Sequence, residues 1–216
     1  MSGAKNAIYT AIFGGYDKLK EPVVVTPGWD YIAFSDEKLH SQRWKTSRFK
    51  RQAMDPARQS KFIKILGTQL LDNYERLIWV DGSLRIKCDL NKFVEKYHKP
   101  PFTVMKHPAR NCIYDEAEII IREKIDKEKT IREQLGFYEA MGFPKNYGLT
   151  ANGVMIMDVG KIDGEFLRYW WDMVKKFSKR DQMSFMYAMW LHPVPYHMIP
   201  YDIIFNEFEF VRHGNG

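Results

Sequence analysis

Cysteine is scarce in this 216-residue sequence, where only Cys88 and Cys112 occur. Two cysteines cannot form the disulfide framework of a small secreted domain, so they favour a reducing compartment. Long apolar runs are also lacking, and none approaches the roughly 20 residues that a membrane helix needs. The opening stretch MSGAKNAIYT has no hydrophobic segment of the kind that signal peptides carry. The sequence therefore predicts a soluble, cytoplasmic domain without a membrane span.

Several binding motifs are missing as well. There is no GxGxxG dinucleotide fingerprint and no phosphate-binding P-loop. Zinc-finger spacing, a recognition helix and an RNA-binding aromatic pair are absent too. The net charge of +6 still favours an anionic partner. The densest basic run, residues 45–64, has largely helical spacing, which is also typical of a solvated helix face. A nucleic-acid-binding module therefore stays open as an alternative.

What the sequence does contain is alternating strand and helix patterns with 45% hydrophobic residues, enough for one sizeable core. We expect strands at 7–14, 30–36, 76–81, 102–107 and 148–159. We expect helices at 56–74, 165–178 and 181–191, and a helical stretch over 111–142 that is broken once. No repeat or linker divides the chain. The pattern predicts a single α/β domain over residues 1–216, with helices on both faces of a sheet.

Polar or flexible residues stand where the expected strands end. They are Thr10 with Gly14-Gly15, Ser35-Asp36, Asp81-Gly82-Ser83 and Lys106-His107. In parallel sheets ligands bind beyond the carboxyl ends of the strands, so these ends predict a nucleotide site. Without a phosphate loop, a bound diphosphate needs a metal, and a strand-end carboxylate such as Asp81 is the hard ligand that Mg²⁺ or Mn²⁺ prefers. The alternative is that Asp81-Gly82 is simply a turn.

A series of motifs then resembles a known family. AIYTAIFGGYD, YIAFSD, ARQSKFIKIL, IWVDGS, KHPARNCIYDEA and RDQMSF follow one another over about residues 7 to 213. In this order they resemble GT-A-type glycosyltransferase domains with a WVD strand end. That family includes plant mucilage-related enzymes, bacterial surface-glycan relatives and the N-terminal domain of a chlorovirus capsid-glycan enzyme, which this sequence resembles most. The resemblance implies a GT-A-like, Rossmann-like domain with a mixed, mostly parallel sheet of about six strands, and a host-cytoplasmic location if the protein is viral.

The resemblance also implies a metal site. Asp81 matches the first Asp of the family's DxD metal motif, but position 83 is Ser instead of the second Asp. Ser83 is then a candidate ligand of the metal or of its bound water. A further ligand is expected from the C-terminal segment, where His213 is favoured and His197 is the alternative. A surface role for His213 near the terminus also stays open.

Further residues are implied for the donor sugar. Asp181 and Gln182 match a pair that opens a helix beside the sugar, and both are expected to be catalytic. Asp181 could instead only cap that helix. Asn152 and Gly153 match a strand that lines the sugar pocket, although Asn-Gly is also common at a bend.

Nucleotide contacts complete the implied site. Thr10, Ala11, Phe13 and Asp36 would form a small strand-end pocket suited to a pyrimidine. Arg58 and Lys61, three apart on one helix face, would face the nucleotide or its phosphates. His107 and Arg110 would border the donor or acceptor sugar, with a solvated loop as the alternative for Arg110.

Together these residues imply a glycosyltransferase that uses Mn²⁺ or Mg²⁺. It would transfer a hexose or deoxyhexose, of glucose or rhamnose type, from a UDP-sugar to a hydroxyl of a glycan or glycoprotein. The resemblance leans towards retention of the anomeric configuration. Because the second Asp is missing, a degenerate GT-A fold that serves as a binding or scaffold domain is the main alternative.

Overall fold

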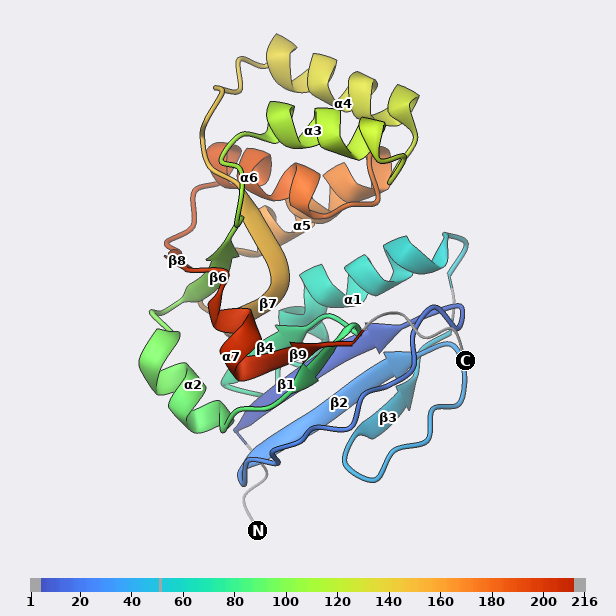
Figure 1. Ribbon diagram of the computed structural model, residues 1–216, viewed down its shortest axis with the longest axis vertical. Helices are drawn as coiled ribbons and strands as arrows, with labels where there is room; N and C mark the ends of the chain where they lie inside the picture. Colours follow the sequence, from blue (N-terminus) through green and yellow to red (C-terminus); the bar gives the residue numbers. More distant parts are fainter. Residues whose placement is uncertain (1–4, 51, 212–216) are drawn as a thin grey trace.

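The computed structural model describes residues 5–50 and 52–211. Its centre is a seven-stranded sheet with the order β3-β2-β1-β4-β7-β6-β8 (Figure 1). The strands are β1 (Asn6–Ile12), β2 (Trp29–Ser35), β3 (Lys45–Arg48), β4 (Arg76–Val80), β6 (Phe102–Lys106), β7 (Thr150–Asp158) and β8 (His197–Ile199). A two-stranded sheet joins β5 (Leu84–Ile86) to β9 (Phe208–Phe210).

The pairing of the strands brings several chain segments to one edge of the sheet. β1 runs parallel to β2 and β4, and β6 runs parallel to β8, whereas β7 is antiparallel to β4 and β6. The end of β4 therefore lies beside the middle of β7, with Val80 opposite Val154, and the first half of β7 extends past it. The expected mixed, mostly parallel sheet is confirmed, with seven strands in place of about six.

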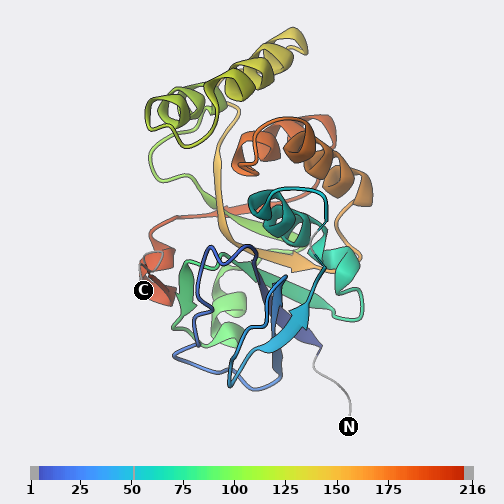
Figure 2. The same cartoon turned by 90° about the vertical axis from the view of Figure 1, so that its right-hand side faces the viewer.

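Buried side chains fill both faces of this sheet, as period-2 alternation along each strand requires. On β4, Leu77 and Trp79 belong to one buried cluster, and Ile78 and Val80 belong to another. The first cluster is completed by α1 (Pro56–Leu70), α3 (Ile113–Arg122), α4 (Glu128–Ala140), α5 (Gly164–Lys176) and α6 (Gln182–Leu191). The second is completed by α2 (Leu90–Tyr97), α7 (Ile203–Glu207) and the β5–β9 sheet. Figure 2 shows α3 and α4 at the far end of the first layer, beyond α5 and α6.

The break expected in the 111–142 helical stretch is confirmed between α3 and α4. Of the described residues in the basic run 45–64, only those from Pro56 onwards are helical, where the helix was expected to begin. Lys45–Arg48 forms the edge strand β3, whose four residues are all exposed, and α1 begins only at Pro56. Asp55 caps that helix by accepting a hydrogen bond from the Arg58 N–H (3.0 Å). Among the described residues, no helix is long and apolar enough to span a membrane.

Candidate functional site

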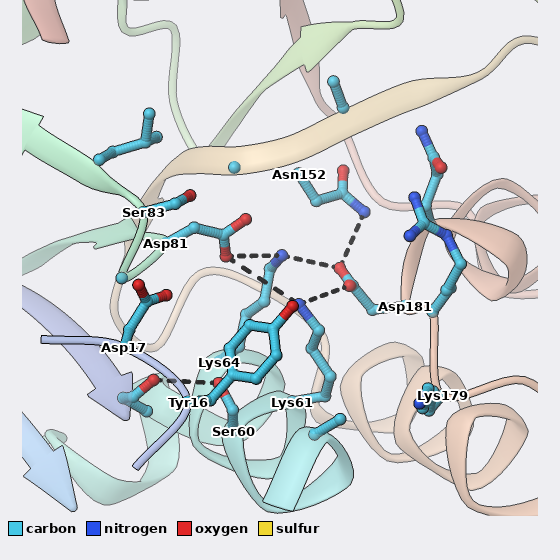
Figure 3. A pocket seen from close by; sticks show the side chains of 18 of the residues that line it. Tyr16, Asp17, Ser60, Lys61, Lys64, Asp81, Ser83, Asn152, Lys179 and Asp181 are labelled. Carbon is cyan, nitrogen blue, oxygen red and sulfur yellow. Dashed lines mark hydrogen bonds and ion pairs between the residues drawn. The ribbon is translucent and has the colours of Figure 1, made fainter. Parts of the chain in front are cut away.

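A cavity of about 570 Å³ opens at the sheet edge where β4 ends and β7 begins (Figure 3). This volume lies in the range of small-molecule sites, which is roughly 300–1,000 Å³. Segments that are far apart in the sequence contribute to its walls: the end of β1, one side of α1, the β4 turn, the first half of β7 and the start of α6. The predicted residues that line it are Ala11, Phe13, Lys61, Asp81, Gly82, Ser83, His107, Asn152, Gly153, Asp181 and Gln182.

Asp81 follows the last residue of β4. Its backbone N–H donates to the Gly153 carbonyl (2.8 Å), and its own carbonyl accepts from the Leu84 N–H (2.9 Å). The turn is therefore closed by backbone groups. The carboxylate accepts a hydrogen bond from Trp79 Nε1 through Oδ1 (2.8 Å) and lines the cavity with its side chain 33% exposed. A turn-forming role alone does not account for that placement.

Two lysines and two aspartates form an ion cluster, which we define as Lys61, Lys64, Asp81 and Asp181 (Figure 3). Lys64 Nζ lies 2.8 Å from Asp181 Oδ2 and 3.5 Å from Asp81 Oδ1, although only 1% of its side chain is exposed. Lys61 Nζ lies 3.1 Å from Asp181 Oδ1 and 4.0 Å from Asp81 Oδ1. Buried charges are costly unless they are paired, and this cluster pairs two of each sign.

The environment of the cluster shifts the pKa values of Lys61, Lys64 and Asp181. Burial opposes ionisation of Asp181, but the charges of Lys61 and Lys64 hold its pKa well below the usual range. Burial also opposes the charge of Lys61, yet Asp181 and Asp81 raise the pKa of that ammonium. For Lys64 burial prevails and lowers the pKa. Asp181 is therefore an ionised carboxylate at neutral pH.

Asp181 stands at the N-cap position of α6, but its side chain makes no capping hydrogen bond. Its carboxylate instead faces the two lysines and accepts a hydrogen bond from Asn152 Nδ2 (3.3 Å). The capping explanation is therefore wrong for this side chain. Its backbone carbonyl accepts from Trp170 Nε1 (2.9 Å), which anchors the start of α6 to α5.

Two buried acceptors in the cavity have no hydrogen-bond partner among the described residues: Asn152 Oδ1 and Gln182 Oε1. The amide nitrogens of both residues are engaged, that of Asn152 with Asp181 and that of Gln182 with the Thr150 carbonyl (2.8 Å). A buried acceptor without a donor costs about 1–3 kcal/mol. Because an amide oxygen accepts from hydroxyl groups, this wall of the cavity suits a polyhydroxylated ligand.

Arg58 is not part of the cavity, which corrects the expected basic pair. Its guanidinium donates to the carbonyls of Val174 (Nε, 3.0 Å) and Phe177 (Nη2, 2.6 Å) and pairs with Asp55. The carbonyls at the end of a helix lack intrahelical partners, and Arg58 supplies donors to this end of α5. Lys61 is the member of the pair that lines the cavity.

Three other predicted contacts also lie outside the cavity lining. Thr10 is buried in β1, and Asp36 accepts a hydrogen bond from the Gly14 N–H (3.0 Å). Arg110 pairs with Glu116 (2.5 Å). His107 does line the cavity, where its Nδ1 accepts from the Arg110 N–H (3.0 Å).

Of the two histidines proposed as metal ligands, only His197 belongs to the described residues. His197 lies on β8, opposite Thr103 in the sheet register, and does not line the cavity. His213 lies outside the described residues. Within 5–50 and 52–211, no group of three or more His, Cys, Asp or Glu side chains is arranged to hold a metal ion.

The donor set at Asp81 nevertheless fits a divalent ion that is shared with a phosphorylated ligand. Mg²⁺ is usually held by one or two carboxylates together with substrate phosphates and not by an all-protein cage. Asp81 Oδ2 lies 3.6 Å from where a Cβ on Gly153 would stand, so the glycine leaves this oxygen accessible. Asp17 brings a second carboxylate to the cavity, with Oδ2 3.4 Å from the corresponding point on Gly82.

Sequence reasoning missed Lys64, Asp17 and Glu116, all of which line the cavity. Lys64 follows Lys61 by three residues, so helical spacing carried a signal for it. Asp17 is the last residue of the GGYD motif, two positions after Gly15. Glu116 had no distinctive signal, because it lies in a charged helix where solvent exposure is the normal expectation.

Comparisons with known proteins identify relatives of this fold. The model of the TOD1/MUCI70 glycosyltransferase-like domain matches residues 31–205. The probable hexosyltransferase MUCI70 of Arabidopsis thaliana is 25% identical over 142 residues, which are 61% of this chain and 24% of that protein. The apo structure of the WbbM bifunctional glycosyltransferase is similar with a TM-score of 0.52 at 10% identity, over 92% of this chain and 39% of that one. The chain thus spans about a quarter of the curated relative.

Proposed function

Because the chain belongs to the TOD1/MUCI70 family of glycosyltransferase-like domains, we propose that it transfers a hexose or deoxyhexose from a UDP-sugar to a hydroxyl of a glycan or glycoprotein. The observation that carries this proposal is the ion cluster at the sheet edge, set beside the two unpaired amide acceptors Asn152 Oδ1 and Gln182 Oε1. A phosphate needs charged side chains such as those of the ion cluster, and sugar hydroxyls need acceptors such as the two amide oxygens. A nucleotide-sugar needs both kinds of group side by side.

Asp81 and Asp17 would hold Mn²⁺ or Mg²⁺ under the diphosphate, with Ser83 beside them. When bound, such an ion stabilises the negative charge that grows on the leaving nucleoside diphosphate. Lys61, whose side chain is 21% exposed, is placed to donate to a phosphate oxygen without leaving the cavity. Lys64 stays buried and holds the carboxylates of Asp81 and Asp181 in place. Preorganised groups of this kind need little rearrangement during the reaction.

The sugar would lie against Asp181, Asn152 and Gln182. The Asp181 carboxylate accepts hydrogen bonds, and the free amide oxygens accept two more. A general base works best with a pKa near the working pH. Asp181, whose pKa is lowered by the lysines, is a poor base of that kind. This supports retention, in which the departing phosphate takes the proton of the acceptor hydroxyl.

One observation favours a second candidate, a binding domain without catalysis: Ser83 stands where the family's metal motif has its second carboxylate. The two candidates and a nucleic-acid-binding module make different predictions for ligand-induced stabilisation. A thermal-shift panel with UDP, GDP and CMP, each with and without Mn²⁺, separates them.

We expect UDP with Mn²⁺ to stabilise the protein and GDP or CMP to have little effect. At 100 times its dissociation constant, UDP contributes about 2.7 kcal/mol. For a chain of this size that is a rise in Tm of roughly 5–11 °C. Equal shifts with UDP and GDP contradict the donor assignment. Absence of any nucleotide shift favours a non-catalytic domain, and metal-independent, steeply salt-dependent binding of DNA favours the third candidate.

A further inference from the structure

A second, smaller depression of about 290 Å³ adjoins the cavity. We call it the aromatic hollow and define it by its lining residues Tyr201, Ile204, Phe205 and Phe210. They come from α7, the residues before it, and β9, drawn in red in Figure 1. Phe205 is 63% exposed and Phe210 is 57% exposed. Large apolar side chains that gather in the open next to a cavity are typical of a binding surface.

The hollow is continuous with the cavity, since Tyr201, Ile204 and Phe210 line both. The hollow and the cavity meet near Gly153. A Cβ on that glycine would stand 4.0 Å from Ile204 Cδ1 and 3.6 Å from Asp81 Oδ2. Ile204 of the hollow and the Asp81 carboxylate therefore both lie close to the same glycine. A group held in the hollow is next to the place where the donor diphosphate is proposed to bind.

The hollow is built on ordered backbone. β9 pairs with β5, which places Phe210 opposite Leu84 immediately after the Asp81-Gly82-Ser83 turn. The Val211 N–H also donates to the Ser83 carbonyl (2.8 Å), and Lys87 Nζ donates to the Phe205 carbonyl (3.0 Å). Tyr201 and Phe205 meet edge to face, with ring centroids 6.0 Å apart. These contacts hold the rings in a fixed position relative to the Asp81-Gly82-Ser83 turn.

Building on the proposed function, we infer that the aromatic hollow is the acceptor site and that the acceptor presents a neutral sugar ring to Phe205 and Phe210. An acceptor hydroxyl must come within about 3–3.5 Å of the reacting carbon, so the acceptor has to lie at the mouth of the donor cavity. None of the four lining side chains is charged. A pyranose suits such a surface because its C–H face packs on an aromatic ring while its hydroxyl edge stays hydrated.

Saturation-transfer NMR on the full chain tests this, with UDP and diamagnetic Mg²⁺ present and the methyl glycosides of glucose, galactose, mannose and rhamnose as probes. We expect saturation to pass to the ring C–H protons of at least one glycoside. The double variant Phe205→Ala, Phe210→Ala should reduce that transfer at least fivefold. Since both side chains are more than half exposed, its Tm should stay at the wild-type value. The single variant Phe205→Ala, at a residue outside the cavity lining, should leave the UDP dissociation constant unchanged. Tyr147→Ala, at an exposed aromatic outside the hollow and cavity, is the matched control.

Equal saturation transfer in the double variant and the wild type overturns the inference. So does binding of UDP with no transfer to any glycoside, or an acceptor that proves to be a peptide without sugar. If the proposed function itself is wrong, the binding results differ from these outcomes. In that case UDP does not bind, whereas glycosides still bind at Phe205 and Phe210 and lose that binding in the double variant.

Discussion

Lys64 is the residue on which the geometry of the site depends most. It is almost completely buried and joins a carboxylate at the end of β4 to a carboxylate at the start of α6. Its aliphatic stem also brings Nζ to 5.5 Å from the Trp79 ring centroid, and Trp79 in turn holds Asp81. Lys61 touches the same two carboxylates from the solvent side. The two lysines of α1 therefore have different roles. Lys64 stabilises the structure of the site, and Lys61 is accessible to a ligand.

The Lys64→Met and Lys61→Met variants should distinguish the structural role from the ligand-binding role. Lys64→Met leaves buried negative charge undercompensated and should lower the free energy of unfolding by about 3 kcal/mol, as measured by urea titration. Lys61→Met should cost less stability, because the side chain is partly hydrated. It should instead weaken UDP binding by about 1.5–3 kcal/mol in calorimetry while uridine binding hardly changes. An equal loss for uridine and UDP would place Lys61 away from the phosphates.

Asp81→Asn tests the metal role while keeping the shape of the side chain. Asn-Gly forms turns at least as well as Asp-Gly, and the turn here is closed by backbone hydrogen bonds. Folding should therefore survive. Mn²⁺-dependent UDP binding and sugar transfer should collapse, since Ser83 offers no second carboxylate in this turn. Calorimetric UDP binding in Mn²⁺ that stays within a factor of three of wild type, roughly 0.7 kcal/mol, contradicts the metal role.

At the scale of elements, the residue at the start of α6 contributes its side chain to the site and not to capping the helix. Asp181 occupies the N-cap position, yet its carboxylate bonds to lysines from α1 and to Asn152 from β7. Three elements from distant parts of the sequence thus converge on one side chain. The helix keeps its place through the bond from Trp170 to the Asp181 carbonyl, which any residue at 181 could accept.

The Asp181→Asn variant should therefore lose stability in a pH-dependent way. The folded-state pKa of Asp181 is below the unfolded value of about 3.9, so its contribution is present above pH 5. It is lost as the pH falls below about 4 towards the folded-state pKa. Urea unfolding at pH 6 should show the variant about 3–5 kcal/mol less stable than wild type, and the gap should shrink at pH 3.

Two controls bear on this result. Asp158, whose pKa is lowered by Arg76 and His98 against the effect of burial, titrates equally in both proteins and cancels from the difference. Far-UV circular dichroism at pH 6 should match wild type, because no capping bond is removed. A gap that is the same at pH 6 and pH 3 would mean that Asp181 is not ionised in the folded state.

The limits of the sequence analysis also appear at this scale. Strands with apolar runs, such as 76–81, could be predicted, and of their polar ends Asp81 and His107 line the cavity. The strands β3 and β8 could not be predicted, because β3 is wholly exposed and β8 is only three residues long. The separation of Arg58 from Lys61 depends on carbonyls 116 and 119 residues further along the chain, which helical spacing does not reveal. Local patterns predict elements, whereas the partners of a charged side chain depend on tertiary contacts.

At the scale of the whole molecule, one sheet separates two buried clusters, and the cavity takes residues from both sides. Lys61, Asp181 and Gln182 come from helices on the first side. Ile204 and Leu84 come from the second side, where α7 and β5 pack. Ligand binding therefore depends on both clusters at once. The described chain should behave as one cooperative unit in which neither side folds alone.

Neighbouring residues of β4 provide a matched test of this cooperativity. Leu77 and Ile78 are both fully buried, one in each cluster, on the strand that carries Asp81. Leu77→Ala and Ile78→Ala should each lower the free energy of unfolding by about 2–5 kcal/mol, because each leaves a cavity in a packed interior. Tryptophan fluorescence and far-UV circular dichroism should give one coincident urea transition for both variants, with an unchanged m-value. UDP with Mn²⁺ should shift that single transition to higher urea in both. Two transitions in either variant, or a UDP shift confined to one probe, would mean that the two sides of the sheet unfold separately and that the site belongs to only one of them.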